Sequence, residues 1–465
     1  MDPLSQGDGT DADYLRSRVG GEVLRSGDDG YDDARAVWNT RFDSRPSTIV
    51  RCSEPSDVVA AVNFARDRGV ALTIKSGGHD YAGNSASDGG LLVDLSPLTS
   101  VRIDADSKRA RVGAGVTWGA FDHQAQSVGL AAPGGTVSSV GVAGFTLGGG
   151  EGWLARKHGL ALDSLVGADM VTADGEIVRA SADENPDLFW AIRGGGGNFG
   201  VVTTFEFALH EVGPQIVAGQ TIYAFEHAEE LLRFYRDYFS DAPDEVTCYI
   251  FFLRIPPVPP FPEQYHGQLA VDFALFHTGP AEEGLSALAP FQGLGEPILD
   301  MVEPQPYLAL QQAFDSGLGK GHRWYSRAHY LDALSDEAIT TFIRVIEPMP
   351  GSFTTAYFSV GGGAVGRADP AATAFPHRNS KFGLHIFPGW DDPAEDATIM
   401  AWTREVHVAM APHANGGVYV NLLGDDERPR VPAAYGANYS RLAEAKARWD
   451  PDNLFRANHN IEPAS

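Results

Sequence analysis

Glycine is concentrated in three segments between residues 75 and 200, and this restricts the fold more than any other feature of the chain. The first segment, KSGGHDYAG over residues 75–83, follows an apolar run at 70–74 that predicts a buried strand. The other two cover residues 133–152 and 193–200. A glycine turn after a strand lets backbone N–H groups approach an anionic ligand, because no Cβ blocks the way. One cluster could serve only the packing of a twisted sheet. Three clusters predict a long ligand that lies over a sheet and touches several loops.

Two common nucleotide sites do not account for these glycines. The string Gly148-Gly149-Gly150-Glu151-Gly152 does not open a clear apolar helix, as a nicotinamide-binding Rossmann motif requires. The pattern Gly-x-x-x-x-Gly-Lys-Ser/Thr is also missing from the sequence, which argues against a nucleoside triphosphatase.

Charge and cysteine content limit the partners. The formal net charge of −26, from 61 acidic and 35 basic residues, opposes binding to nucleic acid or to an anionic membrane. Residues 1–13 are acidic and polar, unlike a signal peptide, and no run of about 18 apolar residues predicts a membrane span. A cytoplasmic location is therefore expected. Cys52 and Cys248 lie far apart, so we expect neither a disulfide nor a metal site.

The pattern of strands and helices predicts an α+β fold with several parts. A chain of 465 residues is expected to form two or three domains. The alternating strand 201–207 is followed by Gly213-Pro214, which marks a domain boundary. We therefore divide the chain into an N-terminal extension, a first domain, a second domain and a C-terminal segment, with bounds 1–39, 40–214, 215–404 and 405–465.

Six blocks resemble berberine-bridge-enzyme-like oxidases, whose FAD domain is of the PCMH type, and they occur in the expected order. They are SGGH with Gly83, PGGTVS at 133–138, GVAGFTLGGG at 141–150, RKHGLALD at 156–163, DLFWAIRGGGGNFG at 187–200, and a C-terminal block with YVN at 419–421 and NHNI at 458–461. The resemblance implies that 40–214 is a two-lobed FAD-binding domain to which 405–465 returns. It also implies that 215–404 binds substrate on an antiparallel sheet covered by helices.

The resemblance implies FAD as the cofactor and assigns its contacts to these blocks. The expected cofactor-binding residues, besides His79, are Ser76, Gly77, Gly78, Asp80, Gly83, Pro133, Gly134, Gly135, Val137, Val140, Gly141, Gly144, Gly148, Gly149, Gly150, Gly152, Gly200, Val201, Val202, Asn421, Asn458 and Asn460.

His79 matches the histidine that members of this family join through a ring nitrogen to the 8α-methyl group of FAD. Many relatives carry a second link through a cysteine, but Val137 stands at that position here, so His79 is expected to be the single attachment. Val140 matches the position beside the flavin that governs access of oxygen. A valine there favours molecular oxygen as the acceptor, although valine is equally typical of a packed core.

Oxidation of an alcohol needs a base that takes the hydroxyl proton while hydride leaves. Tyr419 matches the tyrosine of the family's Tyr-x-Asn motif and is the expected base. Strand alternation would place Asn421 on the same side. Tyr357, on the strand before three glycines, is the expected acid/base partner.

The function implied is an FAD-dependent oxidase that removes two electrons from a hydroxyl group of a sugar or secondary metabolite and reduces oxygen to hydrogen peroxide. Three alternatives stay open: oxidative C–C or C–N bond formation, a dehydrogenase with another acceptor, and a non-catalytic flavin-binding protein. The expected partners are a small-molecule substrate and oxygen, and the expected assembly is a monomer or homodimer. The sequence does not identify the substrate.

Overall fold

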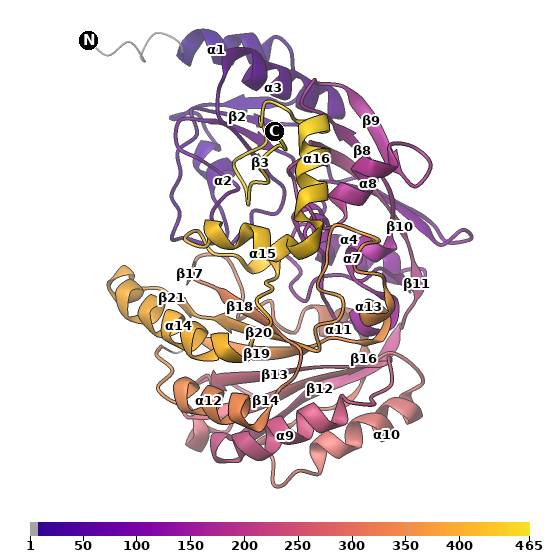
Figure 1. The fold of residues 1–465 in the computed structure, drawn as a ribbon, viewed down its shortest axis with the longest axis vertical. Helices are drawn as coiled ribbons and strands as arrows, with labels where there is room; N and C mark the ends of the chain where they lie inside the picture. Colours follow the sequence, from indigo (N-terminus) through magenta and orange to yellow (C-terminus); the bar gives the residue numbers. More distant parts are fainter. Residues whose placement is uncertain (1–7, 352) are drawn as a thin grey trace.

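Two lobes stand one above the other in the computed structural model, which describes residues 8–351 and 353–465 (Figure 1). The first lobe combines residues from the N-terminal half with the C-terminal helices, and the second carries a broad sheet backed by helices. This arrangement confirms the predicted α+β class.

The first lobe contains a mixed four-stranded sheet of order β1-β2-β4-β3. Its strands are β1 (Glu22–Leu24), β2 (Thr48–Arg51), β3 (Leu72–Lys75) and β4 (Leu91–Asp94). Strands β2 and β3 both run parallel to β4, and β2 reaches β3 through helix α3 (Pro55–Arg68). Two strands that run in the same direction need such a crossover, because a tight turn can join only antiparallel strands. The carboxylate of Asp57 in α3 accepts the N–H groups of Gly20 (2.6 Å) and Ser53 (2.8 Å), which holds the N-terminal segment against the helix.

A second, antiparallel sheet of order β5-β6-β10-β8-β9 completes the first lobe. Its strands are β5 (Val101–Asp104), β6 (Arg109–Gly113), β8 (Leu165–Val171), β9 (Ile177–Ser181) and β10 (Val201–Ala208). Strand β10 alternates buried and half-buried side chains from Thr203 onward, as expected for a central strand with one face in the core.

The second lobe is an eight-stranded antiparallel sheet whose main path is β15-β12-β14-β13-β19-β20-β18, with β16 also paired to β12. The strands are β12 (Gln215–Ala224), β13 (Val246–Arg254), β14 (Leu269–His277), β15 (Leu299–Asp300), β16 (Glu303–Pro306), β18 (Arg327–Leu331), β19 (Thr355–Val360) and β20 (Phe382–Phe387).

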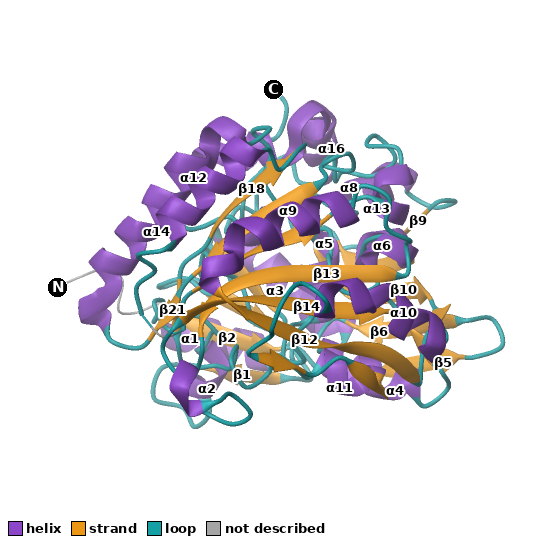
Figure 2. Cartoon of the chain, turned by 90° about the horizontal axis from the view of Figure 1, so that it is seen from below, coloured by secondary structure: helices purple, strands orange, loops and turns teal. Residues whose placement is uncertain are grey.

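Four helices cover one face of this sheet, as Figure 2 shows from below. They are α9 (Ala228–Tyr238), α10 (Ala281–Gln292), α12 (Asp336–Ile346) and α14 (Asp396–Met410). Their apolar faces bury Leu231, Leu288, Phe342 and Val406 in one core with the sheet. Because the helices take one face, the other is left for the first lobe and for a cavity between the two.

Short elements complete the fold. They are α1 (Asp8–Arg16), α2 (Tyr31–Arg35), α4 (Trp118–Gln126), β7 (Leu130–Ala131), α5 (Val142–Leu147), α6 (Ala155–His158), α7 (Ala161–Ser164), α8 (Pro186–Ile192), β11 (His210–Glu211), α11 (Tyr307–Gln311), β17 (Arg323–Trp324), α13 (Gly363–Arg367), β21 (Gly389–Trp390), α15 (Val431–Tyr435) and α16 (Tyr439–Trp449). No helix in the described ranges is both long and apolar enough to cross a membrane.

These bounds refine where we propose to divide the chain. Strand β1 pairs with β2, so we propose that the first domain begins ahead of residue 40 and includes the described part of the N-terminal extension. Strand β12 begins at Gln215, directly after the boundary expected at 214. Helix α14 continues to Met410, and we place the return to the first lobe after it rather than at 404.

The C-terminal segment is fastened to the first lobe by a buried ion pair. In Figure 1 the yellow helix α16 lies beside α8 of that lobe. Lys446 Nζ donates to Asp450 Oδ2 (2.6 Å) and to the carbonyl oxygens of Asn198 (2.8 Å) and Phe455 (3.0 Å), and both side chains of the pair are fully buried. The lysine therefore connects α16 to the third glycine cluster.

We expect Lys446→Ala to lower the free energy of unfolding by about 3–5 kcal/mol, because Asp450 would stay buried without its cation. Urea denaturation of the flavin-loaded protein measures this. The control is Arg448→Ala, which breaks an ion pair between Asp187 and an arginine side chain that is 65% exposed. This change should cost less than about 1 kcal/mol. Equal losses in the two variants would contradict the importance of the buried pair.

Candidate functional site

A cavity of about 1100 Å³ lies between the glycine loops of the first lobe and the uncovered face of the large sheet. The first lobe contributes the segments around residues 76–80, 135–151 and 196–202. The sheet contributes side chains from β12, β13, β14, β19 and β20, and the C-terminal segment closes the wall with residues 419–422 and 455–459. The volume exceeds that of a pocket for one drug-sized ligand.

Most of the site residues expected from the sequence line this cavity. They are Ser76, Gly77, Gly78, His79, Asp80, Gly135, Val137, Val140, Gly141, Gly144, Gly148, Gly200, Val201, Val202, Tyr357, Tyr419, Asn421 and Asn458. Ser76 and Asn458, at opposite ends of this set in the sequence, thus meet at one place.

Seven of the expected residues do not line the cavity: Gly83, Pro133, Gly134, Gly149, Gly150, Gly152 and Asn460. Some have a packing role instead, since a Cβ on Gly83 would meet the Phe42 ring at 2.4 Å and one on Gly152 would meet the Gly134 carbonyl oxygen at 1.8 Å. Gly150 does not line the cavity itself, but its N–H group donates a hydrogen bond to the hydroxyl oxygen of Tyr419, which does.

Close backbone approach explains two of the glycines in the cavity wall. A Cβ on Gly77 would lie 2.4 Å from the backbone nitrogen of Gly141, so the first two glycine clusters touch where any side chain would separate them. A Cβ on Gly148 would lie 1.9 Å from Asn421 Oδ1. These contacts leave a smooth strip of backbone along the cavity.

His79 stands at the end of this strip in an apolar environment. Its ring stacks on Trp38, with 4.9 Å between ring centroids, and Nε2 lies 2.8 Å from Ser139 Oγ. Burial, together with the positive charge of Lys320, lowers the pKa of His79 to about 3. The imidazole is therefore neutral at physiological pH and retains a nitrogen lone pair.

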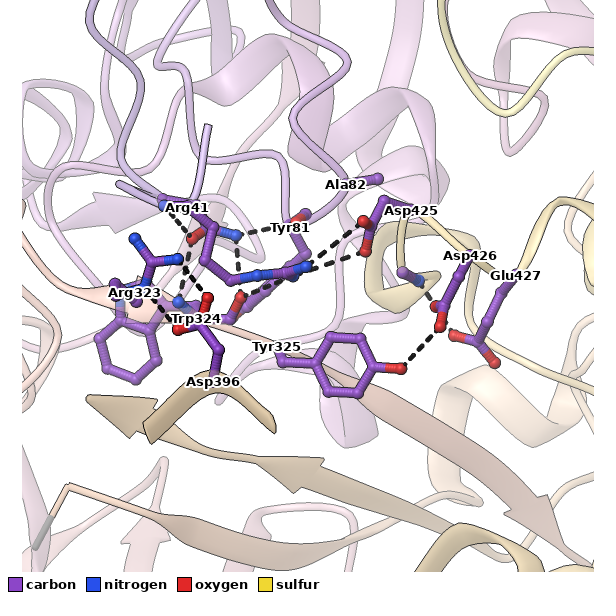
Figure 3. Close-up of polar contacts among 12 residues, drawn as sticks. Arg41, Tyr81, Ala82, Arg323, Trp324, Tyr325, Asp396, Asp425, Asp426 and Glu427 are labelled. Atoms are coloured by element: carbon purple, nitrogen blue, oxygen red, sulfur yellow. Dashed lines mark hydrogen bonds and ion pairs between the residues drawn. The ribbon is translucent and has the colours of Figure 1, made fainter. Parts of the chain in front are cut away.

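A polar network around Trp324 holds the two lobes together (Figure 3). Arg41 reaches the carboxylate of Asp425 and the carbonyl oxygen of Trp324 (3.3 Å each), and Arg323 forms an ion pair with Asp396. Tyr325 donates to Asp426 Oδ2 (2.9 Å) in the same network. The rings of Trp324 and Trp38 stack with a centroid distance of 4.7 Å, so this network fixes the support of His79.

The hydroxyl of Tyr419 is surrounded by N–H donors. Its oxygen accepts hydrogen bonds from Gly150 N (2.8 Å), Asn421 Nδ2 (2.9 Å) and Glu151 N (3.4 Å). The strand expected here is a short 3-10 turn over Val420–Leu422, yet the two side chains still meet because the turn brings Asn421 back to Tyr419. Burial raises the pKa of Tyr419 to about 12, and these hydrogen bonds oppose the rise because they stabilise the phenolate.

Tyr357 belongs to a row of side chains that crosses five strands of the large sheet at one level. Residues paired directly across antiparallel strands share a face, and the pairings give the order Ile222, Asp272, Phe251, Tyr357, His385. All five line the cavity. The Tyr357 ring stacks on the ring of His385 at a centroid distance of 4.5 Å, and burial lowers the pKa of His385 to about 3.

Among the polar side chains at this site that sequence reasoning missed are Ser139, Glu151, Asp272 and His385. Glu151 has the clearest signal, since it is a charged residue inside a run of glycines. His385 and Asp272 lie on strands whose pairing the sequence does not give.

The cavity therefore has two chemically different ends, and its first end fits FAD. That end is a glycine-lined strip with His79 at its tip and with Asn458 Oδ1 buried and without a hydrogen-bond partner among the described residues. Such a strip suits a long anionic cofactor that approaches the backbone. The second end combines aromatic rings with polar side chains, as a substrate pocket does.

Comparison with known proteins supports this reading. A family model described as FAD binding domain matches residues 46–181, and one described as berberine and berberine like matches residues 418–462. The chain is 32% identical to (R)-6-hydroxynicotine oxidase of Paenarthrobacter nicotinovorans over 96% of this chain and 97% of that one. It is 31% identical to an FAD-linked oxidoreductase of Dictyostelium discoideum over 96% and 95%.

Solved structures agree with the sequence relatives. The 6-hydroxy-D-nicotine oxidase of Arthrobacter nicotinovorans superposes with a TM-score of 0.86 at 29% identity, covering 96% of this chain and 98% of that one. Xylooligosaccharide oxidase of Myceliophthora thermophila gives a TM-score of 0.85 at 25% identity, covering 98% and 99%. With its cavity and both domain matches, the chain belongs to the berberine-bridge-like family and is an FAD-linked oxidoreductase.

Proposed function

We propose that this enzyme oxidises a hydroxyl group of a sugar or a ring-bearing secondary metabolite, with Tyr419 as the base and molecular oxygen as the final acceptor. The observation that carries the proposal is the cradle of N–H donors around the Tyr419 hydroxyl in the cavity wall. When bound, FAD supplies the hydride acceptor. The relatives named for hydroxynicotine and for xylooligosaccharides indicate that the family accepts chemically different substrates.

The three donors prepare Tyr419 to take a proton. As the substrate hydroxyl approaches, the phenolate form of Tyr419 accepts its proton at Oη, and the N–H groups of Gly150 and Asn421 stabilise the negative charge before transfer. Aromatic residues on the facing sheet, among them Tyr249, Phe251 and Tyr357, exclude water and orient the substrate.

His79 is proposed to be the single covalent link to FAD. The Ser139 hydroxyl can accept the Nε2 proton of His79, which leaves the lone pair on Nδ1 available to form the bond. Val137 lines the cavity and carries no thiol for a second link, and Val140 lines it as the small residue proposed to admit oxygen.

For the link, we expect yellow colour to stay with the polypeptide after denaturation in acid, and His79→Ala to release its flavin. Absorbance of the precipitated protein and of the supernatant measures this. His227→Ala, which changes a 43% exposed histidine outside the cavity, should keep the colour. A covalent flavin in His79→Ala would contradict the assignment.

For the base, we expect Tyr419→Phe to lower kcat/KM by about 10²–10⁴, the usual contribution of a general base. Because the pKa of Tyr419 is raised, kcat/KM of the wild type should increase from neutral to alkaline pH as the phenolate forms. Tyr419→Phe should lose this increase. The measurement is hydrogen peroxide release over a panel of sugars, polyketides and alkaloids across pH.

That same panel tests the acceptor. Oxygen consumption should match substrate oxidised one to one. Turnover with an artificial dye but without oxygen consumption would contradict the oxidase assignment and favour a dehydrogenase.

A further inference from the structure

We propose that the substrate end of the cavity is a cation site, in which the carboxylate of Glu151 pairs with a protonated amine of the substrate inside a wall of aromatic rings. This inference rests on the proposed function in one respect: it assumes that the ligand bound at this end of the cavity is the substrate. It narrows the substrate class to an amine-bearing, ring-containing metabolite.

Glu151 is a carboxyl group placed at the centre of the reaction site. It lines the cavity and is half-buried, so a ligand can reach it. Five tyrosines interact with its charge: Tyr235, Tyr249, Tyr330, Tyr357 and Tyr419. Burial raises the pKa of Glu151, opposed only by a hydrogen bond with Ser359. Within the described residues it takes part in no ion pair, so no cation in that part of the chain neutralises its charge.

A second carboxyl group lies in the wall of the same cavity. Asp272 is fully buried, accepts a hydrogen bond from Gln220 Nε2 at Oδ2 (2.5 Å), and has no partner at Oδ1 among the described residues. Burial raises its pKa to about 7. No cationic side chain in the described part of the chain interacts with it either, so a cation in the cavity would favour the charged form of both carboxyls.

The strand order places these groups around one volume. Asp272 and Tyr357 are separated by a single strand, which carries Phe251, so their backbones are about 10 Å apart. Glu151 reaches the same row from the other side, through Ser359, which follows Tyr357 by two residues on β19. Tyr249 and Phe251 line the same cavity, and aromatic rings attract cations.

The basic side chains Arg254 and His385 in the cavity wall do not neutralise these carboxyl groups. Arg254 lines the cavity but donates to the carbonyl oxygens of Met349 and Gly267. His385 stays neutral because burial lowers its pKa to about 3. With two carboxyls and no opposing cation, the site favours an ammonium group over a neutral sugar hydroxyl or a carboxylate. The net charge of −26 would also draw a cation toward the protein.

The test compares 3-phenylpropylamine with its neutral isostere 3-phenylpropan-1-ol as ligands of the flavin-loaded protein without oxygen, by isothermal titration calorimetry. We expect the wild type to bind the amine about tenfold more tightly or better, the usual gain from a charged partner. Glu151→Gln, which keeps shape and the backbone N–H to Tyr419, should abolish the preference. Glu151→Asp should retain it.

Two further variants separate a local effect from a general one. Asp272→Asn should reduce the amine preference by a smaller factor than Glu151→Gln, because we expect Asp272 to attract the ammonium group electrostatically from a distance rather than to contact it. Asp122→Asn is the matched control: Asp122 is also buried, receives a hydrogen bond from an amide (Gln311, 2.8 Å), and has a pKa raised to about 7, but it lies outside the cavity lining. It should leave the preference unchanged.

Two results would overturn the cation site: no preference for the amine in the wild type, or an undiminished preference in Glu151→Gln. Binding is measured without turnover, so the outcome is independent of the oxidase proposal. Selective amine binding by a protein that consumes no oxygen with any substrate would refute the proposed function and leave the cation site standing.

Discussion

The hydrogen bond from Gly150 N to Tyr419 Oη joins the second glycine cluster to the C-terminal segment at the cavity, and the rest of the cavity is arranged around it. The C-terminal segment must return across the first lobe to bring Tyr419 there, and the buried Lys446–Asp450 pair anchors that return. Gly148 must lack a side chain, because Asn421 occupies the space where its Cβ would stand. The same segment thus closes the cofactor strip and carries Tyr419, the residue that we propose as the base.

The two ends of the cavity differ in the charge of the ligand that they favour. The glycine strip offers backbone N–H groups to an anionic cofactor, whereas the other end holds Glu151 and Asp272, neither of which is paired with a cation among the described residues. Buried charges without partners are costly unless a ligand provides the partner. Backbone N–H groups at one end of a cavity favour an anionic ligand, and carboxyl groups at the other end favour a cationic one. One continuous cavity can therefore bind two ligands of opposite charge.

Much of the first lobe could be predicted from the sequence because its signals are local. Residues 75–83 contain a strand end, a glycine turn and His79 within nine positions, and His79 does stand in the cavity wall. The sequence of the second lobe contains no comparable local motif. The cavity residues of this lobe depend on which strands pair, and paired strands such as β13 and β19 are far apart in the sequence. A shift of one residue in the pairing would turn each of these side chains to the opposite face of the sheet.

By itself, the sequence determined the glycine strip, the histidine at its end and the order of the blocks that hold FAD, since each depends on a few neighbouring residues with special backbone freedom. Only the tertiary structure decided that Tyr419 lies among three N–H donors and that Asp272, Phe251, Tyr357 and His385 form one row. It also decided that Glu151, one more residue of a glycine run, faces that row. These properties arise from contacts between distant segments, and such contacts exist only when the chain has folded.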